Sequence, residues 1–357
     1  MALSDYDYAL PEESIAQAPL AERDASRLLV LDRRTGALAH RRYSELPELL
    51  RPGDLLVLND SRVVPARLLG SKRRTGGRAE LLLVHPADGA ALAPALQEST
   101  GAHPWACLGQ ASKGLRSGTE LVFAGGLTAT VEGPLAEGEL RVVFAGPATL
   151  GERLAAAGQL PLPPYIARPP TAADAERYQT VYARVPGSVA APTAGLHLTP
   201  RLLERLAARG IVTAPVTLDV GPGTFLPVRS EDESLHRMHP EAFDVPEATA
   251  AAVTRARSEG RRVVAIGTTV VRTLESAFTD GAVQPGPGRT DLFIRPGYRF
   301  RVVDALLTNF HLPRSTLLML VCAFGGREQV LGAYRAAVEA GYRFFSYGDA
   351  MLVEDGR

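Results

Sequence analysis

The chain has 357 residues, of which 46% are hydrophobic and 22% are charged, a composition typical of globular proteins that excludes a long disordered or fibrous portion. Lys plus Arg and Asp plus Glu both number 39, so the formal net charge is zero and no global field attracts a polyanion. The length exceeds the size at which single cores usually stop growing, so we expect two domains.

Cysteine usage and hydropathy indicate the compartment. Cys107 and Cys322 are far apart and form no C-x-x-C pair, so neither a disulfide framework nor a zinc ribbon is expected. The acidic start lacks the basic and apolar regions of a signal peptide. The longest apolar run, Leu317–Phe324, is far shorter than the ~20 residues that span a bilayer. We expect a cytoplasmic, monomeric protein with no membrane contact and no obligate protein partner.

The first elements are a hairpin, a helix and a strand. Ser26–Asp32 and Ala37–Tyr43 are extended runs separated by a Thr-Gly turn, Ser44–Leu50 has helical spacing, and Asp54–Asp60 is a buried strand.

Short β-prone runs separated by glycines fill residues 63–148, and no convincing helix interrupts them. This texture predicts a small β-barrel or sandwich domain inserted into a discontinuous domain of residues 1–62 and 149–357. The runs are Val64–Leu69, Ala79–Val84, Glu120–Phe123, Leu127–Val131 and Leu140–Phe144.

Helices and strands alternate after the insert, which predicts an α/β domain with a large, mainly parallel sheet. The predicted helices are Pro200–Arg209, Pro246–Gly260, Val270–Phe278, Ser315–Gly326 and Gln329–Gly341. The predicted strands are Val212–Val220, Arg262–Gly267, Asp291–Ile294, Ala305–Phe310 and Arg343–Tyr347.

Polar residues at strand ends are the candidate ligand sites, because open α/β sheets bind ligands there. Asp60 and Arg62 follow a predicted strand, either as part of an Asx-turn or as an acid and a guanidinium at a cleft. The small residues of 187–197 form either a tight packed loop or a backbone that approaches a ligand closely. That segment contains Thr193 and ends at His197.

The turn with Asp219, Gly221 and Gly223 imitates the S-adenosylmethionine loop of Rossmann-type methyltransferases. Phe225 stands where the third glycine belongs, and no amphipathic helix follows, so this analogy is weak.

Two imidazoles and a carboxylate follow in His236, His239 and Glu241, with the chemistry of an acid–base cluster. A metal site is not expected, because no helix or strong third ligand supports the histidine pair.

A turn into a helix offers free amides for an anionic ligand at Thr268 and Thr269, although either threonine is equally a simple N-cap. Arg272 is either a ligand contact or an exposed partner of Glu275.

Asn309, His311 and Asp349 again follow apolar runs. Walker loops, nucleophile elbows and metalloprotease helices are absent from the sequence, so the common hydrolase and phosphoryl-transfer classes lose support. The densest basic cluster is either a solvated loop or a phosphate contact for RNA. It consists of Lys72, Arg73, Arg74 and Arg78.

Taken together and in order, these motifs resemble the S-adenosylmethionine:tRNA ribosyltransferase-isomerase family of queuosine biosynthesis. The matching segments are 59–67, 187–197, 220–225, 236–241, 267–272, 308–313 and 342–349. The resemblance implies an α/β domain with an inserted small β-barrel. It also implies that the ribosyl part of S-adenosylmethionine is transferred and isomerised onto 7-aminomethyl-7-deazaguanine at the tRNA wobble position. The products are epoxyqueuosine-tRNA, adenine and methionine, and S-adenosylmethionine is a consumed substrate, with no other cofactor.

This chemistry needs a base, because the sulfonium acidifies the neighbouring 5′ carbon and proton removal opens the ribose and expels adenine. As hypotheses, His197, His236 and His239 are the candidate bases, with Asp60 and Glu241 orienting them. Arg272, Thr268 and Thr269 hold the methionine carboxylate, and Asn309, His311 and Asp349 contact adenine or ribose.

Two positions depart from the family pattern. Asp219 stands where the family commonly has histidine, and Leu198 replaces an aromatic residue. Asp219 either takes over an acid–base role or marks a different substrate. The alternatives are a methyltransferase, which releases S-adenosylhomocysteine, and a non-catalytic tRNA-binding relative, which binds tRNA with a steep salt dependence and releases no adenine.

Overall fold

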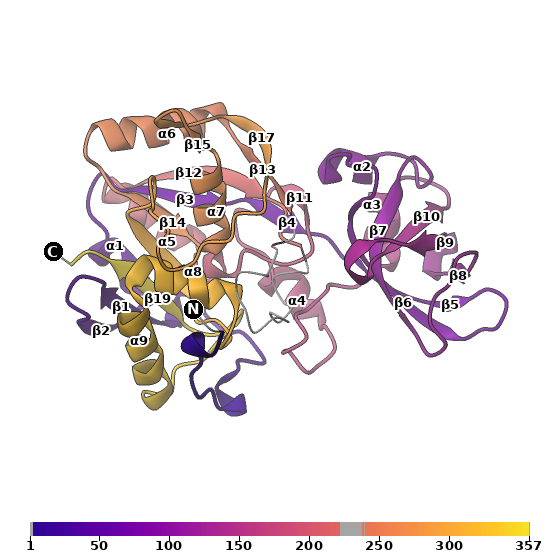
Figure 1. The fold of residues 1–357 in the computed structure, drawn as a ribbon, viewed down its shortest axis with the longest axis horizontal. Helices are drawn as coiled ribbons and strands as arrows, with labels where there is room; N and C mark the ends of the chain where they lie inside the picture. Colours follow the sequence, from indigo (N-terminus) through magenta and orange to yellow (C-terminus); the bar gives the residue numbers. More distant parts are fainter. Residues whose placement is uncertain (1–2, 222–237, 239, 357) are drawn as a thin grey trace.

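The computed structural model describes residues 3–221, 238 and 240–356. A large lobe of sheet and helices carries a smaller lobe of antiparallel strands, which stands to one side of it (Figure 1). Within the described residues, no helix is both long and apolar enough to cross a bilayer.

The large lobe is built on one mixed sheet. Its central strands β12, β3, β14 and β18 run parallel, and the neighbouring β19 is antiparallel to β18 but parallel to β1. In spatial order the described strands are β17 (Gly286–Thr290), β13 (Glu241–Val245), β12 (Val212–Leu218), β3 (Leu55–Asn59), β14 (Val263–Ile266), β18 (Ala305–Asn309), β19 (Ala350–Glu354), β1 (Arg27–Asp32) and β2 (Leu38–Arg42).

Helices cover both faces of this sheet, which explains why its central strands are continuous apolar runs. One face packs against α6 (Glu247–Ser258), α7 (Thr268–Ser276), α8 (Thr316–Gly325) and α9 (Arg327–Glu339). The other face packs against α1 (Leu46–Leu49) and α5 (Pro200–Ala208). The α/β prediction is therefore confirmed, and the sheet is mixed, with antiparallel ladders at its two edges and between β18 and β19.

The small lobe is a closed barrel, so no edge strand is left unpaired. Its core contains Trp105, Leu81 and Phe144, all of which are buried. The barrel strands are β5 (Arg67–Lys72), β6 (Arg78–Pro86), β7 (Pro104–Ala111), β8 (Glu120–Val122), β9 (Thr128–Pro134) and β10 (Leu140–Ala145). The predicted inserted barrel is confirmed, whereas the residue boundaries of the two domains stay a prediction.

Short elements complete the described fold. They are the parallel pair β4 (Ser61–Val63) and β11 (Val185–Ser188), the hairpin β15 (Phe278–Thr279) and β16 (Ala282–Val283), and the helices α2 (Leu92–Gln97), α3 (Leu150–Ala157) and α4 (Ala172–Arg177).

Three predicted element assignments were wrong. Helix α2 lies inside the insert, where no helix was expected. Residues Asp291–Ile294 are not a strand, because the carbonyl of Leu292 accepts a hydrogen bond from the Arg272 side chain. Residues Arg343–Tyr347 are not a strand either, because Phe345 has a left-handed φ of 68°, and the last strand is β19 instead.

The parallel register brings the carboxyl ends of β3, β12, β14 and β18 to one edge of the sheet. Asn59 ties two of these ends together: its Nδ2 donates to the carbonyl of Leu218, and its Oδ1 accepts from the Leu218 amide. The sheet thus presents a fixed edge at which loops from distant parts of the sequence meet.

Candidate active site

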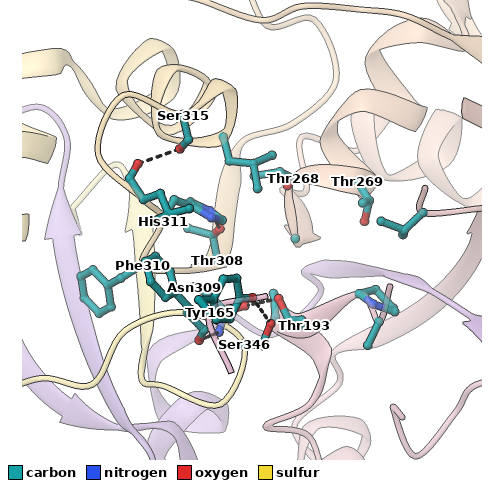
Figure 2. Close-up of a pocket in the computed structure, with 18 residues that line it drawn as sticks. Tyr165, Thr193, Thr268, Thr269, Thr308, Asn309, Phe310, His311, Ser315 and Ser346 are labelled. Carbon is teal, nitrogen blue, oxygen red and sulfur yellow. Dashed lines mark hydrogen bonds between the residues drawn. The ribbon is translucent and has the colours of Figure 1, made fainter. Parts of the chain in front are cut away.

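A pocket opens at this edge, beyond the ends of β14 and β18. Figure 2 shows Thr193, Asn309 and Ser346 close together at one end, His311 and Thr308 in the middle, and Thr268 and Thr269 to one side. The lining consists of Tyr165, Ala191, Pro192, Thr193, Ala194, Val220, Gly267, Thr268, Thr269, Thr308, Asn309, Phe310, His311, Leu312, Ser315, Leu317, Phe345 and Ser346.

Small residues form one wall because the chain is tightly packed behind them. Thr193–Gly195 is a single 3-10 turn. A Cβ at Gly195 would lie 2.0 Å from the hydroxyl oxygen of Tyr182, so no larger residue fits without displacing that ring. Glycine at position 195 therefore allows the backbone of this segment to lie close to the pocket.

Thr193 and Asn309 meet across the pocket wall. The hydroxyl of Thr193 donates to Asn309 Oδ1 at 2.7 Å, while Asn309 Nδ2 lies 3.3 Å from His197 Nε2 and 3.3 Å from the carbonyl oxygen of Phe345. Asn309 is only 2% exposed, so these contacts account for its polar atoms.

His197 lies behind that wall and is buried. Its Nδ1 is 3.0 Å from Ser26 Oγ, and its ring stacks on Tyr43 with the centroids 4.8 Å apart. Burial lowers the pKa of His197 to about 4, which keeps the imidazole neutral near pH 7. Both ring nitrogens are engaged by protein groups, so its role as a base stays a prediction without support from this geometry.

The start of α7 forms another side of the pocket. Gly267 has a φ of 93°, a conformation that glycine adopts without strain, and it turns the chain from β14 into the helix. Thr268 and Thr269 follow it in the first helical turn, where backbone amides lack intrahelical acceptors.

The pocket also contains an imidazole that was predicted and three hydroxyls that were not. His311 Nε2 lies 2.8 Å from Thr308 Oγ1, and burial lowers the pKa of His311 to about 3. Tyr165 Oη lies 2.5 Å from Ser346 Oγ. The motifs contained Thr308 and Ser346 without singling them out, while Tyr165 follows a proline-rich connector that carried no motif.

Arg272 and Glu241 come together, but outside the pocket lining. Their side chains form an ion pair, and both residues are less than 10% exposed. Arg272 also donates to the carbonyls of Leu292 and Thr290, and Glu241 Oε1 accepts from the amide of Gly221 at 3.2 Å. The N–H groups of Arg272 thus donate to groups inside the protein. This geometry does not support a ligand contact of Arg272, which stays a prediction.

Asp219 directly follows β12, and its backbone amide donates to the carbonyl of Ala242 in β13. Among the described residues its buried Oδ1 has no hydrogen-bond partner, and it lies against the backbone of Gly187. Burial, with a smaller contribution from Glu241, raises the pKa of Asp219 to about 7. This carboxyl can therefore exchange a proton near neutral pH.

Two predicted acids have structural partners. Asp60 Oδ2 accepts from Arg184 at 2.8 Å and its Oδ1 accepts from Thr217 at 2.6 Å. Asp349 accepts from the amides of Arg27 and Arg343, each at 2.8 Å. Neither lines the pocket.

The remaining predicted residues lie elsewhere. Arg62 is exposed on β4. His236, His239 and Gly223 lie outside the described residues. Across the described ranges, no group of three His, Cys, Asp or Glu side chains is arranged to hold a metal ion.

The basic cluster occupies the hairpin between β5 and β6, in the barrel lobe that stands apart from the sheet (Figure 1). Lys72 Nζ donates to the carbonyl of Gly114, and Arg73 pairs with Glu120 at 3.3 Å. Arg74 and Arg78 are exposed.

A family model described as queuosine biosynthesis protein matches residues 3–353 of the chain. The chain belongs to this family. Among curated members of the queuosine biosynthesis protein family, the S-adenosylmethionine:tRNA ribosyltransferase-isomerase of Anaeromyxobacter dehalogenans (strain 2CP-C) is 60% identical over 354 residues, which are 99% of each chain. The protein of the same name from Sorangium cellulosum is 54% identical and covers 97% of each chain.

A solved family structure has the same architecture. The S-adenosylmethionine tRNA ribosyltransferase of Thermotoga maritima is 40% identical and superposes with a TM-score of 0.55, covering 98% of this chain and 100% of that one. The resemblance stated from the sequence motifs is thus confirmed. Of the predicted site residues, those that line the pocket are Thr193, Thr268, Thr269, Asn309 and His311.

Proposed function

We propose that this chain is an S-adenosylmethionine:tRNA ribosyltransferase-isomerase. It transfers and isomerises the ribosyl moiety of S-adenosylmethionine onto 7-aminomethyl-7-deazaguanine at the tRNA wobble position. Epoxyqueuosine-tRNA, adenine and methionine are released. The observation that carries the proposal is the end-to-end match to curated relatives of that name at up to 60% identity. The pocket at the carboxyl edge of the sheet supports it.

The pocket has the chemistry that a nucleoside with an amino-acid tail requires. Hydroxyls of Thr193, Thr308 and Ser346 line the pocket and suit the ribose and the base, which carry both hydrogen-bond donors and acceptors. The free amides at the start of α7, next to Thr268, suit the carboxylate of the methionine moiety.

Among the candidate bases that the structure describes, Asp219 is the one best suited to transfer a proton. A base whose pKa lies near the working pH is the most effective one, and the pKa of Asp219 is raised to about 7. His197 and His311 are neutral at that pH, but their ring nitrogens already contact Asn309 and Thr308. Asp219 is not among the residues that line the pocket, but it directly precedes Val220, which does, and from there it would remove the proton that the sulfonium acidifies at the 5′ carbon. His236 and His239 remain further candidates.

The exposed cations of the β5–β6 hairpin are proposed to contact the tRNA backbone. The formal net charge is zero, so a local cluster has to supply the attraction. Arg74 and Arg78 are the members of the cluster that are exposed and without an ion pair among the described residues. Their guanidinium groups are suited to phosphate oxygens.

The test is product analysis. Purified protein is incubated with S-adenosylmethionine and tRNA that carries the aminomethyl-deazaguanine, and the supernatant is separated by chromatography. The proposal expects free adenine and methionine in equal amounts, and only when the modified tRNA is present. Release of S-adenosylhomocysteine would instead identify a methyltransferase, and tRNA binding without either product would identify a non-catalytic relative.

A further inference from the structure

A chain of hydrogen bonds leads from the protein interior to the pocket wall. Ser26 Oγ lies 3.3 Å from the carbonyl oxygen of Arg23 and 3.0 Å from His197 Nδ1. His197 Nε2 lies 3.3 Å from Asn309 Nδ2, and Asn309 Oδ1 lies 2.7 Å from the hydroxyl of Thr193. Of these four side chains, those of Ser26, His197 and Asn309 are buried, whereas Thr193 is half-buried and lines the pocket.

The Asn309 side-chain amide, near the pocket end of this series of hydrogen bonds, has a fixed orientation. The carbonyl oxygen of Phe345 can only accept, and it lies 3.3 Å from one end of the Asn309 amide. That end must be the NH₂ group, because a flipped amide would place two acceptor oxygens against each other. Asn309 Oδ1 therefore points to Thr193, and since a carbonyl oxygen only accepts, the Thr193 hydroxyl must donate its proton to it.

The same logic fixes the proton of His197. Asn309 donates to Nε2, so this nitrogen carries no proton and the neutral ring is protonated at Nδ1. Nδ1–H donates to Ser26 Oγ, and the Ser26 hydroxyl donates in turn to the carbonyl of Arg23. The Arg23 carbonyl beside Ser26 and the Phe345 carbonyl beside Asn309 give every group a role it can fill. A doubly protonated ring would set N–H against N–H.

The surroundings of His197 keep it neutral. Burial is the main cause of its low pKa, Asp349 and the Arg23 carbonyl act in the opposite direction, and the charges of Arg23 and Arg343 lower the pKa further. The stacked ring of Tyr43 completes the enclosure.

We infer that this series of hydrogen bonds uses the only proton of the Thr193 hydroxyl, so that toward the pocket this hydroxyl can only accept a hydrogen bond. Thr193 then recognises a hydrogen-bond donor of the substrate, a hydroxyl or amino group of the nucleoside. His197 is a positioning residue, which fixes the Asn309 amide and through it the Thr193 hydroxyl. The inference rests on the proposed function for the identity of the ligand, but the arrangement of protons in the free protein does not depend on it.

The proton arrangement is tested without substrate by nuclear magnetic resonance of the full chain with ¹⁵N-labelled histidine. The His197 signals are assigned by their loss in His197→Gln, or by selective broadening if that variant does not fold. We expect an unprotonated Nε2 and a protonated Nδ1 throughout about pH 5.5–8.5, since an unperturbed imidazole would titrate within this range. A protonated Nε2, or a titration midpoint near pH 6.5, would overturn the inference.

The recognition role is tested by calorimetric titration of S-adenosylmethionine into Thr193→Val and Thr193→Ser. Valine keeps the shape but leaves a substrate donor unpaired, so its Kd should rise about tenfold or more, whereas serine should stay within about threefold of the parent. Equal affinity of the valine variant and the parent would contradict the inference.

Substrate analogues identify the donor. The probes are S-adenosylmethionine lacking the 2′-hydroxyl, lacking the 3′-hydroxyl, or dimethylated at the 6-amino group. One of them should bind the parent about tenfold more weakly than S-adenosylmethionine does, and should lose nothing further in Thr193→Val. If every analogue is weakened equally by the valine substitution, Thr193 does not pair with a donor. If the parent neither binds S-adenosylmethionine nor releases adenine, the proposed function fails instead.

Discussion

The guanidinium of Arg272 pairs with the carboxylate of Glu241 in the protein interior. The pair joins α7 to β13, and the remaining contacts of Arg272 reach the carbonyls of Leu292 and Thr290. An arginine expected from the sequence to hold a ligand is thereby part of the scaffold that supports the site.

The Arg272→Met variant should therefore be much less stable to unfolding than the parent protein. Removing one partner leaves the carboxylate of Glu241 buried without its counter-charge, which typically costs about 3–5 kcal/mol. Urea unfolding followed by circular dichroism measures the loss. Arg289→Ala is the control, since Arg289 is exposed on β17 and its removal should change stability by no more than about 0.5 kcal/mol. Similar midpoints for the two variants would contradict the scaffold role.

Asp219→Asn should alter the pH dependence of stability. The pKa of Asp219 is raised from its usual 3.8 to about 7, so between these values the folded protein holds a proton that the unfolded chain has released. Stability from this group is full below about pH 4 and is lost as the pH rises toward 7 and beyond. Asparagine cannot lose a proton, so the variant should gain on the parent between pH 4 and 8 by at least about 1.4 kcal/mol, the equivalent of one pKa unit. A pH-independent difference in urea unfolding would show that the carboxyl titrates normally.

Gly195→Ala should strain the pocket wall. The new Cβ would meet the Tyr182 hydroxyl, and overpacking of this kind costs about 1–3 kcal/mol. Among the described residues that hydroxyl has no hydrogen-bond partner, so adding Tyr182→Phe should recover at least half of the loss in melting temperature. Gly133→Ala, where nothing lies within 4 Å of the added Cβ, is the control. If the effects of the two substitutions simply add in the double variant, the contact with the Tyr182 hydroxyl is not the source of the strain.

Replacing Arg74 and Arg78 together with alanine should weaken tRNA binding without affecting the Kd of S-adenosylmethionine. Each lost phosphate contact should reduce the slope of log affinity against log salt by about 0.7–0.9. Filter binding at several salt concentrations gives the slope. Arg209→Ala, which removes an exposed cation from the end of α5, serves as the control. An unchanged slope would remove the hairpin from the RNA interface.

Much of the fold could be predicted from the sequence because its central strands are short apolar runs bounded by turn residues, as in β3, β14 and β18. The failures occurred where tertiary contacts override local preference. The aromatic residues of 343–347 have strand propensity, yet the chain turns at Phe345, whose carbonyl binds Asn309, and the strand begins only at Ala350.

The site was partly predictable for a related reason. Motifs locate the ends of strands, so Thr193 and Asn309 were identified, but a motif does not say which way a side chain points. Arg272 sits one turn after the start of α7 and points inward to Glu241, which only the packing decides. Tyr165 belongs to no motif, and only the folded chain brings it beside Ser346.

The most direct test of the account follows the ribose carbons. S-adenosylmethionine labelled with ¹³C in all ribose positions is incubated with the enzyme and tRNA that carries the aminomethyl-deazaguanine, and the digested tRNA and the small molecules are analysed by mass spectrometry. We predict that all five labelled carbons appear in the modified tRNA nucleoside, while the released adenine is unlabelled. Label retained in S-adenosylhomocysteine or in an adenosine product, with an unchanged tRNA nucleoside, would contradict the account.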